Sequence, residues 1–151
     1  MSRVYVASPL GFDAAGRLFN SARLLPALLA AGLEPLDPWA QGLAADTEGD
    51  PEALRELNER IGARNVELLD EADAVLAVLD GVDVDSGTAA EIGFASARGI
   101  PIVGLRTDVR AAGDNVAALV NLQVEHFIRR TGGTVVRELD DAIQAVVRKL
   151  E

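Results

Sequence analysis

The residues best suited to chemistry lie in the segment Asp85-Ser-Gly-Thr-Ala-Ala-Glu-Ile-Gly93. Two apolar runs, residues 74–79 and 100–105, flank it and predict strands. A strand, a glycine-bearing loop and a helix would place side chains at the carboxyl edge of a parallel sheet, where open α/β folds bind ligands. Two carboxylates at one such junction, Asp85 and Glu91, indicate sugar or glycosyl chemistry rather than redox or phosphoryl transfer.

Glu91 also has a purely structural interpretation. Thr88-Ala-Ala-Glu91 fits the Ser/Thr-x-x-Glu capping box, in which the glutamate only closes the start of a helix. In the functional interpretation Glu91 lies in the first helical turn, where the helix dipole favours the ionised carboxylate. That ionised form is the one that attacks an anomeric carbon. Spacing alone leaves both interpretations open, and Asp85 is by default a solvated turn residue.

Several kinds of site are excluded by what the chain lacks. It has no cysteine and one histidine, which excludes thiolate nucleophiles and multi-histidine metal centres. The aspartates of residues 80–87 do not have the EF-hand spacing. The glycines form neither a Walker A loop nor a Gly-x-Gly-x-x-Gly motif, so nucleoside triphosphates and dinucleotides lack their usual phosphate loop. We expect no metal site.

Charge and hydropathy limit the partners. The net charge is −10 and the chain has no basic stripe, which argues against binding to nucleic-acid polymers. The N-terminus lacks the pattern of a signal peptide. The longest nearly apolar run, residues 24–33, is too short to span a bilayer, so no membrane association is expected. We therefore expect a cytoplasmic protein that binds a small ligand.

The order of predicted elements indicates the fold. Strands are predicted at residues 4–7, 33–36, 73–79, 101–105 and 134–136, and helices at 14–31 (kinked at Pro26), 51–71, 88–98, 115–130 and 138–150. Residues 40–50, rich in Gly, Ala and acids, are predicted to form a mobile loop. Strands alternating with helices predict an α/β fold: a single-domain, doubly wound, flavodoxin-like, five-stranded parallel sheet with helices on both faces, spanning residues 1–151.

Other candidate residues allow two interpretations each. Tyr5, on the first strand, is typical of a core aromatic residue, but its hydroxyl could reach a site near the carboxyl-end loop. Phe12 and Trp39 are suited either to packing or to stacking on a flat ligand. Asn65 lies inside a predicted helix and would normally face solvent, and His126 is more typical of a helix surface than of catalysis.

Taken together, these segments resemble the nucleoside 2-deoxyribosyltransferases and the related deoxynucleoside monophosphate N-glycosidases. The resemblance covers most of the chain. Its motifs are Val4-Tyr-Val-Ala-Ser-Pro-Leu10, Arg64-Asn-Val-Glu-Leu-Leu-Asp-Glu-Ala-Asp-Ala-Val75, Asp85-Ser-Gly-Thr-Ala-Ala-Glu-Ile-Gly93 and Val120-Asn-Leu122. The third motif is quite specific, because the two acids, the glycine and their spacing recur together in the family.

The resemblance implies a role for each matching residue. Glu91 would be the nucleophile and Tyr5 the residue that orients it, while Asp85 would bind the sugar 5′-hydroxyl. Asn65 matches a position that contacts the base, and Asn121 matches an asparagine that a neighbouring subunit donates to the sugar. Three further positions are expected at the substrate site: Pro9, Phe12 and Gly87. The chain lacks the aromatic C-terminal tail of some members, so the group that protonates the leaving base is not identified.

The resemblance also implies an activity. The expected reaction is transfer of 2-deoxyribose between purine or pyrimidine bases by retaining double displacement, without any cofactor. The expected partners are deoxynucleosides, free nucleobases and a second copy of the chain, with a dimer as the minimum assembly. The alternatives are hydrolysis of 2′-deoxynucleoside 5′-monophosphates, with side hydrolysis also possible in a transferase, and a non-catalytic nucleotide-sensing domain on the same fold.

Overall fold

The computed structural model describes residues 1–41 and 49–151 and contains a five-stranded sheet in which all the pairings are parallel. The strands are β1 (Arg3–Ala7), β2 (Glu34–Leu36), β3 (Ala74–Val78), β4 (Ile102–Leu105) and β5 (Val135–Val136). Their order in the sheet is β2-β1-β3-β4-β5. This is the flavodoxin-like order, whose ligands bind at the switch point between β1 and β3. The predicted fold class is confirmed.

Helical segments connect the strands. They are α1 (Ala14–Phe19), the π-helix η1 (Asn20–Leu24), α2 (Leu25–Ala30), the 3-10 helix η2 (Pro38–Gln41), α3 (Pro51–Glu71), α4 (Ser86–Arg98), α5 (Leu122–Arg130) and α6 (Leu139–Leu150). Pro51 occupies the first position of α3, and Asp50 caps that helix by accepting a hydrogen bond from the amide of Ala53. No helix in the described ranges is both long and apolar enough to cross a membrane.

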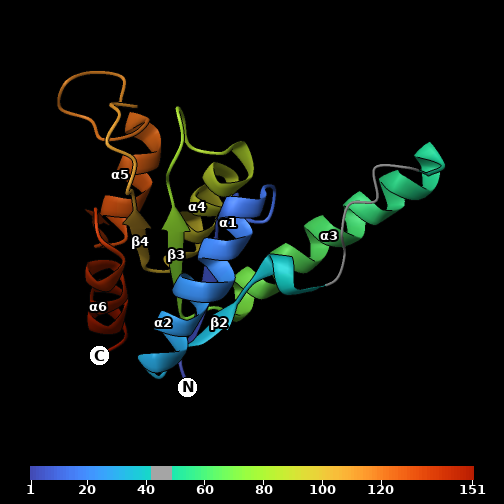
Figure 1. Cartoon of the computed structure of the whole chain (residues 1–151), viewed down its shortest axis with the longest axis horizontal. Helices are drawn as coiled ribbons and strands as arrows, with labels where there is room; N and C mark the ends of the chain where they lie inside the picture. The colour runs from blue at the N-terminus through green and yellow to red at the C-terminus, as the bar shows by residue number, and fades with distance from the viewer. Residues whose placement is uncertain (42–48) are drawn as a thin grey trace.

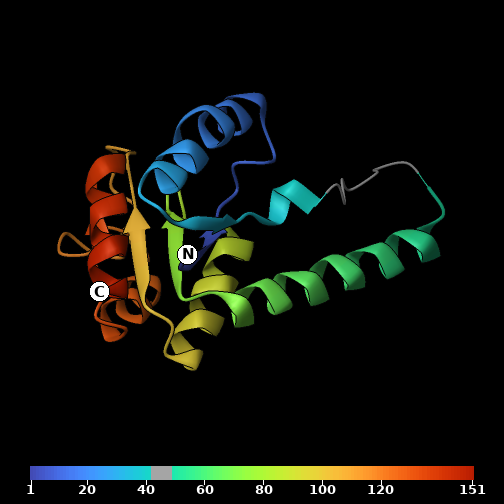
Figure 2. The same ribbon diagram turned by 90° about the horizontal axis from the view of Figure 1, so that it is seen from below.

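Two hydrophobic clusters lie on opposite faces of the sheet, because neighbouring residues of a strand point to opposite sides. Val4 and Val6 pack with η1, α2 and α6, whereas Tyr5 and Ala7 pack with the C-terminal end of α3 and with α4 and α5. Figures 1 and 2 show these helical layers on the two sides of the strands. The hydroxyl of Tyr5 therefore lies on the same side of the sheet as Glu91 of α4.

Helix α3 is only partly packed. Leu68 and Leu69 near its C-terminus are buried, while most of its earlier residues are exposed or half-buried. In both views its N-terminal half projects away from the sheet as an arm (Figures 1 and 2). Only the last turns of α3 can therefore contribute to a site beside the sheet.

Three sequence predictions require correction or fall outside the described residues. The helix predicted over residues 14–31 is interrupted by the π-helix η1, and Pro26 lies at the start of α2. The helix predicted over 115–130 begins only at Leu122, because the side chain of Asn121 caps it there by accepting from the amides of Gln123 and Val124. The mobile loop predicted for residues 40–50 falls mainly on residues 42–48, which the structure does not describe.

Candidate active site

The centre of the site is a hydrogen bond between β1 and α4. The hydroxyl of Tyr5 donates to Oε1 of Glu91 over 2.6 Å. Tyr5 is fully buried and Glu91 is half-buried, so the pair lies at the boundary between the core and the surface. Because the strand and the helix are both held by the core cluster around Tyr5, the carboxylate of Glu91 has a fixed orientation. Oε2 of Glu91 remains available to a ligand.

The surroundings of Glu91 make its carboxyl group unusually basic. Burial raises its pKa from 4.5 to about 7, the hydrogen bond from Tyr5 opposes this rise, and the charge of Asp85 adds to it. Burial and the negative charges of Glu91 and Asp37 raise the pKa of Tyr5, which therefore remains a hydrogen-bond donor. With a pKa of about 7, Glu91 is present at neutral pH both as the acid and as the carboxylate. In the carboxylate form, Oε1 accepts the hydrogen bond from Tyr5.

Asp85 caps α4, and this corrects two predictions. Its Oδ2 accepts from the amide of Thr88 over 2.9 Å and from the Thr88 hydroxyl over 3.2 Å. The helix therefore begins at Ser86, and the capping box built on Thr88 and Glu91 is wrong. Glu91 lies in the second turn rather than the first, so the helix dipole does not set its ionisation; burial does. Asp85 is not a solvated turn residue: it is half-buried and holds the helix that carries Glu91.

A pocket of about 330 Å³ opens between α3 and α4 beside this pair. Three of the residues expected at the site line it: Asn65 from α3, and Gly87 and Glu91 from α4. The rest of the lining is mostly apolar and includes Val66 and Phe94. The pocket thus brings a carboxylate and a carboxamide to opposite walls of a largely apolar cavity, an arrangement suited to a flat heterocycle with polar edges.

Pro9 and Phe12 do not line this pocket. They lie in the loop after β1, where the amide of Phe12 donates to the carbonyl of Pro9 over 3.1 Å. The Phe12 ring, 71% exposed, makes an edge-to-face contact with Trp39 at 4.7 Å between ring centroids. The indole of Trp39 donates to the carbonyl of Ser8, so its ring braces the loop as a packing residue. Most of the Phe12 ring remains open to solvent.

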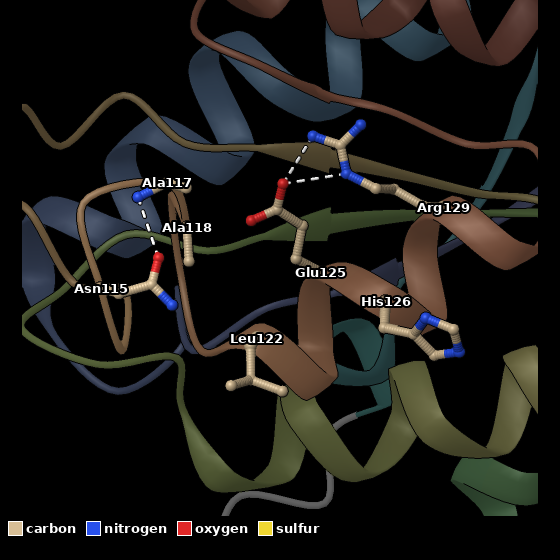
Figure 3. Close-up of a pocket in the computed structure, with 7 residues that line it drawn as sticks. All are labelled: Asn115, Ala117, Ala118, Leu122, Glu125, His126 and Arg129. Atoms are coloured by element: carbon tan, nitrogen blue, oxygen red, sulfur yellow. Dashed lines mark hydrogen bonds and ion pairs between the residues drawn. The ribbon is translucent and has the colours of Figure 1, made fainter.

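The last predicted site residue, Asn121, is likewise separate from the pocket and acts within its own chain as the cap of α5. Figure 3 shows a second pocket, of about 300 Å³, beside the start of that helix. Its lining includes the buried Glu125, which forms an ion pair with Arg129 and accepts from the amide of Leu119 over 3.0 Å. His126 is exposed there, as expected for a helix-surface residue. This second pocket contains none of the predicted site residues.

Sequence reasoning missed two buried charged residues near the carboxyl edge of the sheet. Asp37, directly after β2, accepts from the Asn20 carboxamide over 2.9 Å and from the amide of Trp39 over 3.0 Å. Arg106, directly after β4, is 0% exposed. Their position immediately beyond a strand was the available signal, since ligand-binding residues of such folds follow the carboxyl ends of strands. In the described ranges, no three histidine or acidic side chains are close enough together to hold a metal ion.

Comparisons with solved structures agree with this fold. The chain has the fold of a conserved protein from Enterococcus faecalis V583, with 25% identity, a TM-score of 0.78 and 99% of both chains covered. It also has the fold of the 2-deoxyribosyltransferase of Bacillus psychrosaccharolyticus, with 20% identity, a TM-score of 0.70, and 93% of this chain and 89% of the other covered. The 2-deoxyribosyltransferase of Leishmania mexicana gives 22% identity, a TM-score of 0.66 and 98% coverage of both chains.

No curated protein matches the sequence significantly. A family model, however, matches residues 4–131, which include all but the first residue of β1, the loop that carries Asp85, all of α4 and the cap of α5. That model describes the nucleoside 2-deoxyribosyltransferases. The matched range contains every residue that the sequence placed at the site, and this chain therefore belongs to the nucleoside 2-deoxyribosyltransferase family.

Proposed function

We propose that this protein transfers 2-deoxyribose between nucleobases through a covalent deoxyribosyl ester of Glu91. The observation that supports this proposal most strongly is the contact between Tyr5 and Glu91 at the wall of the pocket. A half-buried carboxylate whose Oε1 is held by a neutral donor presents Oε2 to a bound substrate. A fixed carboxylate beside a cavity is what nucleophilic attack at C1′ requires.

The reaction proceeds in two displacements. In the first, Oε2 of ionised Glu91 forms a bond to C1′, the bond from C1′ to the base nitrogen breaks, and its electron pair leaves with the base, which takes up one proton. In the second, a nitrogen of the incoming base attacks C1′ and gives up its proton, and the ester electron pair returns to Glu91, so that no net proton is gained or lost. Two inversions retain the configuration at C1′. The absence of a 2′-hydroxyl eases formation of the cationic transition state.

The test is base exchange. Deoxyinosine incubated with adenine should yield deoxyadenosine and hypoxanthine, resolved by chromatography, in a ratio that depends on both bases. Formation of hypoxanthine and free deoxyribose without deoxyadenosine would identify a hydrolase instead. Absence of either reaction with several donor nucleosides would contradict the proposal.

We expect this protein to prefer 5′-hydroxyl nucleosides to 5′-monophosphates, because Asp85 places a negative charge near the sugar. Its charge already acts on Glu91, whose pKa it raises. Repulsion between Asp85 and a phosphate dianion should lower kcat/KM for the monophosphate by about tenfold or more. Asp85→Ser should narrow or reverse the preference while still capping α4, since serine is also a good cap.

The control for charge alone is Asp83→Ser. Asp83 lies in the same loop, and among the residues that the structure describes its side chain accepts only from the amide of the adjacent Val84. Asp83→Ser should leave the ratio of kcat/KM for the nucleoside to kcat/KM for the monophosphate nearly unchanged. If the unmodified protein processes the monophosphate better than the nucleoside, the N-glycosidase alternative is correct and the assignment of Asp85 is wrong.

A further expectation is that Asn121 acts on the sugar in the pocket of a neighbouring subunit. Its Oδ1 caps α5, which leaves the carboxamide Nδ2 as the donor for a neighbour. Refolding Glu91→Ala together with Asn121→Ser, two inactive variants, gives mixed dimers with one intact pocket each. Since about half of random dimers are mixed, roughly a quarter of the unmodified activity should return.

The choice of serine at position 121 keeps a capping oxygen on α5, so the loss measured is that of the amide group. Subunit exchange is verified by mass differences between the two chains. If Asn121 serves its own chain, every pocket keeps one defect and activity does not return.

A further inference from the structure

Arg106 is a buried cation for which residues 1–41 and 49–151 provide no ion-pair partner. It is 0% exposed, and none of the ion pairs in the described part of the chain includes it. A guanidinium keeps its charge in proteins, and burying one without a carboxylate costs free energy. An apolar side chain of similar volume would avoid that cost. The contacts of Arg106 indicate what the charge does instead.

Among the described residues, its Nη1 and Nη2 donate to backbone carbonyl groups of two different loops, while its buried Nε has no hydrogen-bond partner. Nη1 donates to Leu79 at the end of β3, and Nη2 donates to Gly81 over 3.2 Å. Nη2 also donates to the carbonyl of Arg110, in the loop after β4, over 2.9 Å. The guanidinium therefore bridges the start of the loop that leads to Asp85 and the start of the loop that leads to Asn121.

Neighbouring contacts join the same two loops. Asp80 accepts from the Thr107 hydroxyl over 2.7 Å and from the amide of Asp108 over 2.8 Å. The amide of Gly81 donates in return to Asp108 over 3.3 Å. The two loops are thus one hydrogen-bonded unit, and Arg106 is its only fully buried charged member. Glu91 and Tyr5 lie outside this unit, on α4 and β1.

We propose that Arg106 is a positioning residue for sugar recognition: it holds the loops after β3 and β4 together, so that Asp85 faces the deoxyribose in its own pocket and Asn121 faces the one in the neighbouring subunit's pocket. This inference rests on the proposed function, in which those two residues contact the sugar. Arg106 contacts neither Tyr5 nor Glu91, which lie on β1 and in the second turn of α4, so Arg106 should govern selection at the sugar 5′-hydroxyl more than the chemical step.

The experiment compares 2′-deoxyinosine with 2′,5′-dideoxyinosine as donors and adenine as acceptor. Arg106→Met keeps the side-chain volume and removes the buried charge. The preference for the 5′-hydroxyl donor is the ratio of kcat/KM for 2′-deoxyinosine to kcat/KM for 2′,5′-dideoxyinosine. This ratio should fall by about tenfold, as expected for the loss of one charged hydrogen bond. The same fall is expected for Asp85→Ser, and the double variant should show no further fall, since both changes remove one contact.

The matched control is Arg110→Met, which removes an arginine from the same loop. The side chain of Arg110 is 60% exposed and pairs with Asp108, while the carbonyl that Arg106 uses is kept. Its preference ratio should stay within about twofold of the unmodified protein, as for other surface charges. An Arg106→Met ratio equal to that of the control overturns the proposal.

A second readout does not require activity. In Arg106→Met, backbone amides of residues 79–88 and 107–122 should exchange with deuterium faster than in Arg110→Met, while those of α6 should not change. No activity in the unmodified protein would refute the proposed function, whereas an unchanged exchange rate would refute the loop bridge itself.

If Arg106→Met does not fold, Gly81→Ala tests the same loop. Gly81 has φ +125°, and a Cβ there would lie 2.9 Å from the carbonyl of Asp83, so alanine must displace the loop while Arg106 stays in place. The preference ratio should fall as in Asp85→Ser. A folded Gly81→Ala variant with the unmodified ratio would overturn the proposal.

Discussion

Replacing Glu91 by glutamine is expected to lower the rate of base exchange by about 10⁴-fold or more, because the variant has no nucleophile for the first displacement. Glutamine has nearly the same shape, and its Oε1 can still accept from Tyr5, so the pocket should keep its geometry. The loss should therefore appear in kcat, with substrate binding nearly unchanged. Rates of deoxyadenosine formation from deoxyinosine and adenine measure both quantities.

The same experiment can detect the intermediate. With deoxyinosine and no acceptor, the unmodified protein should gain the mass of one deoxyribosyl group on the peptide that contains Glu91, and the glutamine variant should not. Glu138→Gln, a surface change of the same type just before α6, should behave as the unmodified protein does. More than about 1% residual activity in Glu91→Gln would remove this residue from the mechanism, given the size of loss expected for a nucleophile.

The fold could be predicted from the sequence because the strand signals, the helix signals and the order of the elements all indicated the same architecture. Five short apolar runs alternated with amphipathic segments, and α3 has the predicted bounds, Pro51–Glu71. Proline at its first position and an aspartate before it left few alternative helix starts. The carboxyl ends of β1 and β3 then placed the tyrosine and the acidic loop at one switch point.

Helix starts were less predictable because short polar side chains compete for the same amide groups. Asp85 and Thr88 are both good caps, and only the structure shows that Asp85 accepts from the amide of Thr88. Leu119, before α5, and Leu122, its first residue, have helical spacing. The amide of Leu119 instead donates to the side chain of Glu125 and that of Leu122 to the side chain of Asp114, so the helix does not extend back beyond Leu122.

Buried charges were the hardest part of the site to predict. Arg106 follows an apolar strand, where an arginine normally marks the return of the chain to solvent. Its burial depends on one carbonyl group of its own loop, that of Arg110, and on two that are distant in sequence, those of Leu79 and Gly81. The pKa of Glu91 is a similar case, since it depends on burial against β1 and on Asp85 rather than on the position of Glu91 in its helix.

The altered ionisation of Glu91 predicts that activity and stability depend on pH in opposite directions. The pKa of Glu91 is about 7 in the folded protein and near 4.5 in the unfolded chain, so the folded state favours the protonated form. Its contribution to stability is fully present below about pH 4.5 and is lost as the pH rises through 7. The nucleophile, however, must be ionised to attack, so turnover should increase over the same range.

Glu91→Gln removes this titration. The free energy of unfolding of the variant, taken relative to that of the unmodified protein, should therefore be about 2–3 kcal/mol higher at pH 8 than at pH 4.5. Urea unfolding of both proteins at several pH values measures the difference directly. Subtracting one curve of unfolding free energy against pH from the other removes the contributions of the other carboxylates, which titrate alike in both proteins. Glu138→Gln, changed at an exposed position, should give a curve parallel to that of the unmodified protein.

The sign of the result separates two roles for Glu91. A glutamate that served mainly to hold Tyr5 and α4 in place would be stabilising when ionised, and its replacement would weaken the protein most at high pH. A nucleophile kept in a partly buried site destabilises the fold when ionised, because its charge is withdrawn from water before substrate arrives. If the stability of Glu91→Gln relative to the unmodified protein is no higher at pH 8 than at pH 4.5, the environment of Glu91 does not raise the pKa of this carboxyl group.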